Sequence, residues 1–154
     1  MHCSATYISP IGTIILESDG QALTGLRFAD EKESVTQTVS GQEDSVLPEA
    51  TQWLEEYFAG KLPQHTPRLS PSGTDFQCRV WQALSIIPYG QTKTYGEIAK
   101  MVGCRSAQAV GQAISRNPIA IIIPCHRVLG STGTLTGYAY GIDRKEYLLK
   151  LEMT

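Results

Sequence analysis

Residues 94–117, TYGEIAKMVGCRSAQAVGQAISRN, decide the fold of the second half of the chain. Thr94 and Glu97 have the spacing of a capping box, in which two side chains satisfy the first backbone amides of a helix. A second helix is expected over 106–115, after a break at 103–105 that contains a glycine. Two short helices joined by so tight a connection predict a helix-turn-helix.

The second of these helices is unusually rich in small residues. Gly111 lies in its interior, where a glycine costs about 1 kcal/mol relative to alanine. Two explanations remain open: a nucleic-acid backbone approaches the helix at this point, or a neighbouring helix packs closely against it. Gln108 and Gln112, four residues apart, share another face. The small residues are Ala107, Ala109, Gly111 and Ala113.

Toward the N-terminus, the pattern predicts a further helix and then a boundary. Thr74 and Gln77 form another capping-box pair, which starts a helix with an apolar stripe. The segment before it, 62–73, contains three prolines and is expected to connect two lobes. We therefore expect an N-terminal domain over 1–70 and a C-terminal domain over 71–154.

The N-terminal domain is expected to be of the α/β type. A β-branched run at 13–16 and a second apolar run at 22–28 flank a short turn and predict a hairpin. A helix is expected from Pro48, where apolar residues recur at three- and four-residue intervals, and Gly60 is its stop signal. The polar stretch 30–44 lacks periodicity and is expected to be a loop or a ragged helix.

Toward the C-terminus, the apolar run 119–123 predicts a buried strand that leads directly to Cys125. The last helix is expected to be capped by Asp143 and Glu146 and to end beside Glu152. Its expected buried residues are Tyr147, Leu148 and Leu151.

The composition predicts a folded protein without a membrane segment. The 154 residues are 42% hydrophobic and 18% charged, which provides enough apolar surface to offset the loss of chain entropy. The longest purely apolar run is 119–123, far below the roughly 20 residues that a membrane helix requires. The N-terminus lacks the basic and apolar regions of a secretion signal, so we expect a cytoplasmic protein with reduced thiols.

The charge is unevenly distributed between the two expected domains. Residues 1–70 hold four basic and ten acidic side chains, a formal charge of −6. Residues 71–154 hold nine basic and five acidic side chains, a formal charge of +4. The C-terminal domain therefore suits a polyanionic partner, with a solvated surface of mixed charge as the alternative.

The cysteines do not predict a metal site. Cys3, Cys78, Cys104 and Cys125 are widely spaced, and no C-x-x-C pair occurs. His2 and Cys3 are interpreted as frayed terminal residues, and Cys78 and Cys104 as packing residues. We expect no metal and no cofactor.

Cys125 differs from the other cysteines because it stands between Pro124 and His126. An imidazole that reaches the thiol, directly or through water, generates the nucleophilic thiolate. Glu152 is a candidate to fix the tautomer of this histidine. From these residues alone, a buried inert cysteine beside a surface histidine remains the alternative.

From residue 74 to residue 152 the chain resembles the O6-alkylguanine-DNA alkyltransferases. The resemblance rests on G-T-D-F-Q-x-x-V-W at 73–81, I-P-Y-G-Q-T-x-T-Y-G-E-I-A at 87–99 and A-V-G-x-A at 109–113. It also rests on N-P-I-x-I-I-I-P-C-H-R-V at 117–128 and L-T-G-Y-A-x-G-I-x-R-K at 135–145. The N-terminal half is similar to the family more loosely, through S-P-I-G-T and E-E-Y-F-A-G.

The resemblance implies a fold and an activity. The implied fold is a ribonuclease H-like α/β N-terminal lobe and an all-α, winged-helix-like C-terminal lobe that carries the helix-turn-helix. The implied activity is direct-reversal DNA repair, in which the alkyl group of O6-alkylguanine, and by the same resemblance of O4-alkylthymine, moves irreversibly to Cys125. Because the product is a thioether without a carbonyl for water to attack, each protein molecule is expected to react once.

The resemblance also implies roles for the residues around the cysteine. The thiolate of Cys125 accepts the alkyl group, His126 acts as the base through water, and Glu152 orients the imidazole. Tyr95 donates a hydrogen bond that neutralises the departing guanine, which suits a phenol because it stays protonated near neutral pH. Asn117 holds the turn between the recognition helix and the active site.

The implied partner is double-stranded DNA, bound through its minor groove by a monomer. The damaged base flips out of the stack, at a cost of a few kcal/mol. The residues implied in guanine binding are Ile114, Val128, Tyr138, Ala139 and Tyr140. The residues implied in DNA binding are Thr94, Ser106, Ala107, Gln108, Gly111, Arg116 and Ser131.

Two residues depart from the family pattern. Gln108 stands where most members carry an arginine that fills the space left by the flipped base, so we expect flipping to persist with lower DNA affinity. Tyr140 occupies a position that is commonly glycine, and its ring is expected to narrow the pocket against bulky adducts such as benzyl.

Two other functions are compatible with these residues. One is an alkyltransferase-like protein that binds lesions without repairing them, although the acceptor cysteine is replaced in such proteins. The other is a cysteine hydrolase that uses Cys125, His126 and Glu152. Turnover separates the three: a hydrolase cycles, a lesion binder transfers nothing, and an alkyltransferase stops after one alkyl group.

Overall fold

The computed structural model describes residues 3–30, 45–135 and 137–153, and the chain divides into two compact units. The first unit comprises Met1–Ser72 and the second Gly73–Thr154. Within the described ranges, no helix is both long and apolar enough to cross a lipid bilayer.

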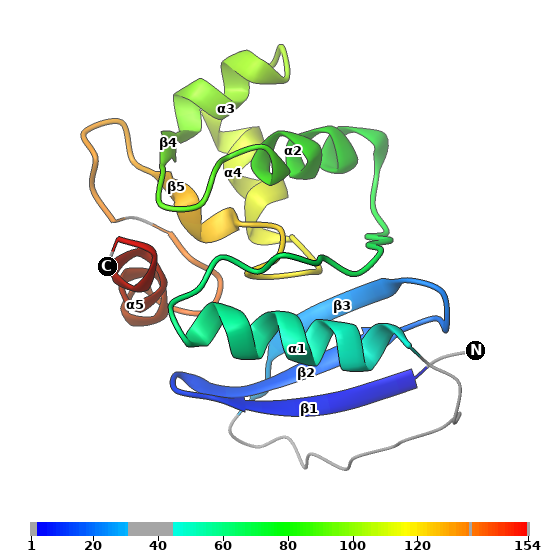
Figure 1. The fold of residues 1–154 in the computed structure, drawn as a ribbon. Helices are drawn as coiled ribbons and strands as arrows, with labels where there is room; N and C mark the ends of the chain where they lie inside the picture. The colour runs from blue at the N-terminus through cyan, green and yellow to red at the C-terminus, as the bar shows by residue number, and fades with distance from the viewer. Residues whose placement is uncertain (1–2, 31–44, 136, 154) are drawn as a thin grey trace. The chain divides into compact units, whose positions relative to one another are not determined.

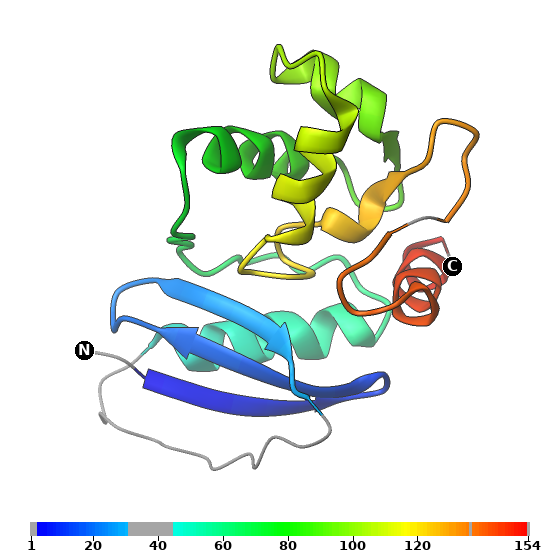
Figure 2. The ribbon, with the colours of Figure 1, turned by 180° about the vertical axis from the view of Figure 1, so that it is seen from behind.

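The first unit is a three-stranded antiparallel sheet with one helix packed on it (Figure 1). The strands are β1 (Cys3–Ser9), β2 (Gly12–Ser18) and β3 (Leu23–Phe28), in the order β1-β2-β3, and the helix is α1 (Val46–Phe58). Figure 2 shows the sheet from its other side. Alternating residues of the strands and one stripe of α1 form the core, which includes Leu16, Leu26, Trp53, Leu54 and Tyr57.

The expected hairpin is confirmed as β2 and β3, but the sheet has one strand more. Cys3 pairs with Ser18 at the end of β1 and is buried, so its interpretation as a frayed residue is wrong. The mixed polar composition of β1 hid this strand, which is stabilised by its ladder with β2. His2 and most of the stretch 30–44 lie outside the described residues. The expected helix is confirmed, although it begins at Val46, two residues before Pro48.

The second unit is predominantly helical, as expected. Its helices are α2 (Asp75–Ser85), α3 (Tyr95–Met101), α4 (Ala107–Ser115) and α5 (Ile142–Glu152), with a short 3₁₀ helix η1 (Cys125–Arg127). The expectation of an all-α lobe is wrong in one detail. The two-residue strands β4 (Lys93–Thr94) and β5 (Val128–Leu129) form a parallel pair, which places the start of α3 beside the end of η1.

Local side-chain caps position the helices of this unit. Both predicted capping boxes are confirmed, because the Thr74 and Thr94 hydroxyls accept the backbone amides of Gln77 and Glu97, each at 3.1 Å. The side chains of Gln77 and Glu97 accept the threonine amides in return, each at 3.0 Å. The indole of Trp81 on α2 donates to the carbonyl of Ala113 at 2.9 Å and ties α2 to α4.

The expected strand at 119–123 is wrong. Ile121 has a positive φ of 68°, and the segment closes on itself through backbone bonds such as Ile123 N to Ile119 O at 3.1 Å. Asn117 holds both ends, since its side chain donates to Ile123 O at 2.8 Å and accepts from Ile119 N at 3.0 Å. A short apolar run indicates burial and does not distinguish a strand from a buried turn, and here the amide of Asn117 replaces a neighbouring strand.

The final helix is confirmed, but its buried face differs from the expected one. Lys145, Leu148 and Glu152 are buried, whereas Tyr147 and Leu151 are partly exposed. The N-cap is Gly141, with a φ of 100° and no side-chain cap, so the expected capping by Asp143 and Glu146 is wrong. The helix thus turns a lysine and a glutamate toward the interior of the unit.

Candidate active site

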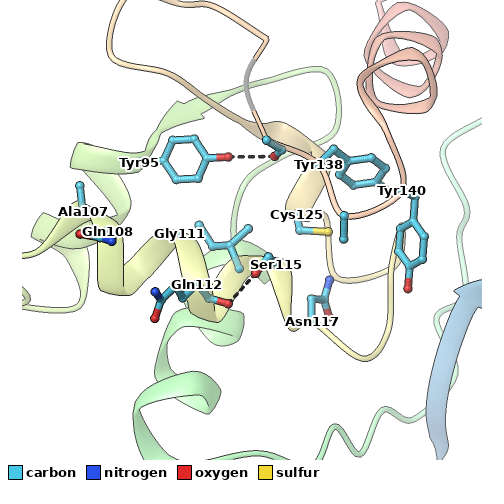
Figure 3. Close-up of a pocket in the computed structure, with 13 residues that line it drawn as sticks. Tyr95, Ala107, Gln108, Gly111, Gln112, Ser115, Asn117, Cys125, Tyr138 and Tyr140 are labelled. Atoms are coloured by element: carbon cyan, nitrogen blue, oxygen red, sulfur yellow. Dashed lines mark hydrogen bonds between the residues drawn. The ribbon is translucent and has the colours of Figure 1, made fainter.

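A cavity of about 680 Å³ lies within the second unit (Figure 3). One face of α4, the first residue of α3, the turn at Cys125 and the loop 137–140 line it. This volume is in the range of small-molecule pockets. The lining residues are Tyr95, Ala107, Gln108, Gly111, Gln112, Ile114, Ser115, Asn117, Cys125, Gly137, Tyr138, Ala139 and Tyr140.

Cys125 is the only cysteine among the residues that line this cavity. It is the first residue of η1, and its side chain is buried with a free thiol. Burial raises the pKa of the Cys125 thiol, while a hydrogen bond with Asn117 and the positive charge of Lys145 act in the opposite direction. The thiol is therefore protonated near neutral pH, and it needs a base to become a nucleophile.

His126 follows the cysteine and is completely buried. Its Nε2 lies 2.5 Å from Oε2 of Glu152 on α5. Burial lowers the pKa of His126, the bond to Glu152 raises it, and the positive charges of Arg127 and Lys145 lower it further. A neutral imidazole that donates from Nε2 to a carboxylate has its lone pair on Nδ1, so the side chain is in the form that accepts a proton.

Tyr95 and Lys145 meet beside the cysteine. Figure 3 marks a hydrogen bond of the Tyr95 hydroxyl with a dashed line. This hydroxyl donates to the carbonyl of Gly137 at 3.0 Å, and Lys145 Nζ lies 5.8 Å from the centre of the tyrosine ring. Lys145 is fully buried, and burial lowers its pKa to about 8. Sequence reasoning missed this lysine, although it lies three and seven residues before Leu148 and Glu152, on the same helical stripe.

The cavity gathers most of the site residues expected from the sequence. Tyr138 and Tyr140 stand edge to face at 5.7 Å, and the buried Ile114 contributes from α4. Among the described residues, the buried Tyr138 hydroxyl has no hydrogen-bond partner. Ala107, Gln108, Gly111, Asn117 and Ala139 also line the cavity, as expected.

Other expected residues lie outside the cavity lining. His126, Glu152 and Val128 are buried and are not part of the lining. Thr94 and Ser106 cap helices, while Arg116 and Ser131 are exposed. Sequence reasoning missed Gln112 and Ser115 as lining residues. Their spacing of four residues from Gln108 and Gly111 on one helix is the signal that would have found them.

The interior glycine of α4 is not explained by close helix packing. A Cβ atom at Gly111 would lie 3.9 Å from Cδ1 and Cε1 of Tyr95, which is an ordinary contact. The small residues Ala107 and Gly111 instead line the cavity. Over residues 3–30, 45–135 and 137–153, no three histidine, cysteine, aspartate or glutamate side chains gather closely enough to hold a metal ion.

A buried thiol that is followed in the chain by a buried histidine–carboxylate pair, at a cavity bounded by α4, has the groups expected of a protein with a nucleophilic cysteine. Two family models match the chain. The model for the ribonuclease-like domain of 6-O-methylguanine DNA methyltransferase covers residues 3–70. The model for the DNA binding domain of 6-O-methylguanine DNA methyltransferase covers residues 75–154.

Individual relatives agree with these models. The chain is 51% identical over 150 residues to the methylated-DNA–protein-cysteine methyltransferase of Methanosarcina acetivorans, with 96% of each chain covered. The solved Mycobacterium tuberculosis O6-methylguanine methyltransferase superposes with a TM-score of 0.86 at 46% identity, covering 99% of this chain and 93% of that one. The same organism's enzyme in complex with DNA gives a TM-score of 0.85 at 48% identity, covering 97% and 92%.

The chain therefore belongs to the 6-O-methylguanine DNA methyltransferase family. Family membership confirms the resemblance drawn from the motifs, and it confirms a ribonuclease-like N-terminal domain and a helical C-terminal domain.

Proposed function

We propose that this chain is a methylated-DNA–protein-cysteine methyltransferase, which repairs O6-alkylguanine in DNA by transferring the alkyl group to Sγ of Cys125. The observation that carries the proposal is the place of Cys125 in the lining of the cavity, next in the chain to the buried His126–Glu152 pair. The methyltransferases named above match nearly the whole chain.

The transfer follows from the groups around the thiol. Nδ1 of His126 accepts the thiol proton, directly or through a water molecule, and the imidazolium is stabilised by the Glu152 carboxylate at 2.5 Å. The thiolate attacks the alkyl carbon, so the S–C bond forms while the C–O6 bond breaks. The electron pair of the broken bond stays on the guanine.

Tyr95 stabilises the departing guanine by donating a hydrogen bond to it. This hydroxyl donates to Gly137 O at 3.0 Å, and the flipped base replaces this carbonyl as the acceptor of the hydrogen bond. Ile114 and Tyr138 enclose the faces of the base, and the backbones of Val128 and Ala139 read its edge.

The reaction consumes the protein. A thioether on Cys125 contains no carbonyl that water can attack, so each chain transfers one alkyl group and stops. The same geometry accepts O4-alkylthymine, which also carries its alkyl group on an oxygen of the ring edge.

The DNA surface centres on α4. Gly111 and Ala107 line the cavity. Because packing within the unit does not require a glycine at position 111, this glycine supports the approach of a DNA backbone through the minor groove. The β4–β5 pair beside α3 supports the reading of this unit as winged-helix-like. The other residues assigned to this surface are Thr94, Ser106, Gln108, Arg116 and Ser131.

The two domains have different roles in this proposal. DNA binding and alkyl transfer belong to residues 71–154, which contain every proposed site residue, and residues 1–70 form the ribonuclease-like domain. By the resemblance stated above, the protein acts as a monomer. It acts in the cytoplasm, where a reducing environment keeps Cys125 a thiol.

The test is incubation with a duplex that carries labelled O6-methylguanine, followed by peptide mass mapping. We expect one methyl group per chain on Cys125, none in Cys125→Ala, and full transfer in Cys104→Ala, which removes a partly exposed thiol outside the cavity lining. Binding to the lesion without transfer would identify a lesion-binding protein. Repeated turnover would identify a hydrolase, and either result overturns the proposal.

A further inference from the structure

The buried side chain of Arg127 is not used by the chemistry described above. It follows His126 in η1, and its guanidinium contacts the same carboxylate as the histidine. Nε donates to Oε1 of Glu152 at 2.8 Å and Nη2 donates to Oε2 at 3.2 Å. Nη1 donates to the carbonyl of Ile87 at 2.7 Å, and the guanidinium lies 5.8 Å from the ring centre of Tyr89. Such a two-pronged contact fixes the plane of a carboxylate as well as its position.

Glu152 has its acceptor sites filled by these contacts. Oε1 accepts from Arg127 Nε and from the backbone amide of Gly90 at 3.1 Å. Oε2 accepts from Arg127 Nη2 and faces His126 Nε2. A buried carboxylate is costly unless it is paired and hydrogen-bonded, and here the pairing charge is the guanidinium. Because the imidazole is neutral, Arg127 is the cation that balances Glu152.

We propose that Arg127 is a positioning residue for the alkyl transfer: it keeps Glu152 an oriented anion, so that His126 stays neutral with its proton on Nε2 and its lone pair on Nδ1. The proposal rests on the proposed function, because it concerns the group that takes the thiol proton. Arg127 is not among the residues that line the cavity, and it acts through Glu152 and His126.

The charges around His126 show why the guanidinium matters. Glu152 on α5 favours the imidazolium, whereas Arg127 on η1 and Lys145 on α5 oppose it. Cys125 precedes the histidine in η1, and Tyr89 lies near both Glu152 and Arg127, with a pKa that burial raises. Removal of Arg127 leaves Glu152 facing His126 with less opposing charge. The pair then takes up a proton as imidazolium and carboxylate, and the imidazolium cannot accept the thiol proton.

Three variants separate the charge of Arg127 from its geometry. In Arg127→Met both are lost, so the pH midpoint of the single-turnover transfer rate should rise by about one unit, with an about tenfold lower rate at pH values well below the wild-type midpoint. In Arg127→Lys the charge remains but the paired N–H donors to Glu152 are lost. The pH midpoint of the transfer rate should therefore stay the same, while the plateau value of that rate falls. Arg79→Met is the control, because Arg79 also donates to a main-chain carbonyl, that of Val102, away from the cavity lining. It should change neither value.

Two readouts do not depend on DNA repair. The first is ¹⁵N NMR of the His126 ring in the unmodified protein, which should show neutral imidazole protonated on Nε2 at neutral pH in wild type and a transition to imidazolium at a higher pH in Arg127→Met. The second is the pH dependence of Cys125 alkylation by iodoacetamide, read by peptide mapping, which should shift in the same direction as the transfer rate.

The outcomes are distinct. A wild-type protein that accepts no methyl group from the DNA refutes the proposed function, while the NMR measurement still tests the role of Arg127. A wild-type His126 that is imidazolium, or protonated on Nδ1, overturns the positioning role without any variant. So does an Arg127→Met protein that is less stable but keeps the wild-type pH midpoint and tautomer. If Arg127→Met does not fold, Arg127→Lys and the wild-type spectrum decide.

Discussion

At the scale of single residues, the site is built from groups whose pKa values are shifted from their ordinary values by burial. Burial raises the pKa of Cys125 and lowers those of His126 and Lys145. Near neutral pH the site therefore contains a protonated thiol and a neutral imidazole, and its lysine titrates near pH 8. Such a site stays unreactive until a substrate binds beside the thiol, because only then does the transfer of the thiol proton lead to attack on the alkyl carbon.

The first residue-scale prediction concerns stability and Lys145. Its folded pKa of about 8 lies below the unfolded value of 10.5, so the unfolded chain binds more protons between these two values. The free energy of unfolding should therefore rise with pH across this window, and the cost of the buried lysine, about 3 kcal/mol, should be complete below pH 8. Lys145→Met should abolish this rise.

Urea unfolding at a series of pH values measures the effect. Both proteins should carry Cys125→Ala, because the raised pKa of the cysteine makes an opposite contribution to the unfolding free energy above the ordinary thiol pKa of 9. Parallel curves of unfolding free energy against pH, with and without Lys145→Met, would show that the lysine does not titrate in this window.

The second residue-scale prediction concerns Tyr140, whose ring stands against Tyr138 in the cavity lining. Tyr140→Gly should open this wall and raise the rate for benzyl adducts relative to methyl adducts several-fold, because the larger group needs the space that the ring occupies. Tyr140→Phe keeps the ring and should leave the ratio unchanged. Single-turnover rates with the two lesions give the ratio, and an equal ratio in wild type and Tyr140→Gly would contradict the idea.

At the scale of elements, short helices with strong caps hold the site. Ser106 caps α4 by accepting the amide of Ala109 at 3.1 Å, and Trp81 ties the far end of α4 to α2. Asn117 then turns the chain from α4 toward η1 and the thiol. The position of the cysteine is thus set by a sequence of local hydrogen bonds, each joined to the next element.

The matched capping boxes of α2 and α3 give the element-scale prediction. Thr74→Ala and Thr94→Ala should each lower the free energy of unfolding by about 1 kcal/mol, because each removes the same cap. Thr94 is also assigned to the DNA surface, so only Thr94→Ala should weaken duplex binding beyond this loss of stability. Urea titrations and DNA titrations of both variants, with Thr→Ser as the rescue, make the comparison. Equal DNA affinities in the two alanine variants would remove Thr94 from the interface.

At the scale of the whole molecule, charge is divided between the halves of the sequence. The site lies entirely in the half with a formal charge of +4, and the other half carries −6. DNA binding by such a protein depends on a local cationic surface in a chain whose net charge is −2. The affinity for DNA should therefore be modest and sensitive to any added cation near the cavity.

Gln108→Arg tests this dependence. The substitution adds a cation on α4 at the cavity, so duplex affinity should rise and the slope of log affinity against log salt should steepen by about 0.9. Gln52→Arg adds the same charge on an exposed position of α1 and serves as the control. Affinity measured between low and moderate salt should change in the first variant only. Equal gains in both would mean that net charge, not the α4 surface, governs binding.

The sequence by itself determined the helices, the capping boxes of α2 and α3, the hairpin and the adjacency of Cys125 and His126 in one motif. These features depend on residues three or four apart, or adjacent, so the pattern of one segment encodes them. The membership of the family followed from the same segments, since its motifs are local stretches.

Only the tertiary structure decided how Glu152, Arg127 and the carbonyl of Ile87 converge, since these residues are 25 and 40 positions apart along the chain. It also decided that Lys145 is buried and that 119–123 forms a turn in place of a strand. In each case the local sequence is compatible with more than one outcome. The choice is made by partners distant in the sequence, which supply the hydrogen bonds and opposite charges that burial requires.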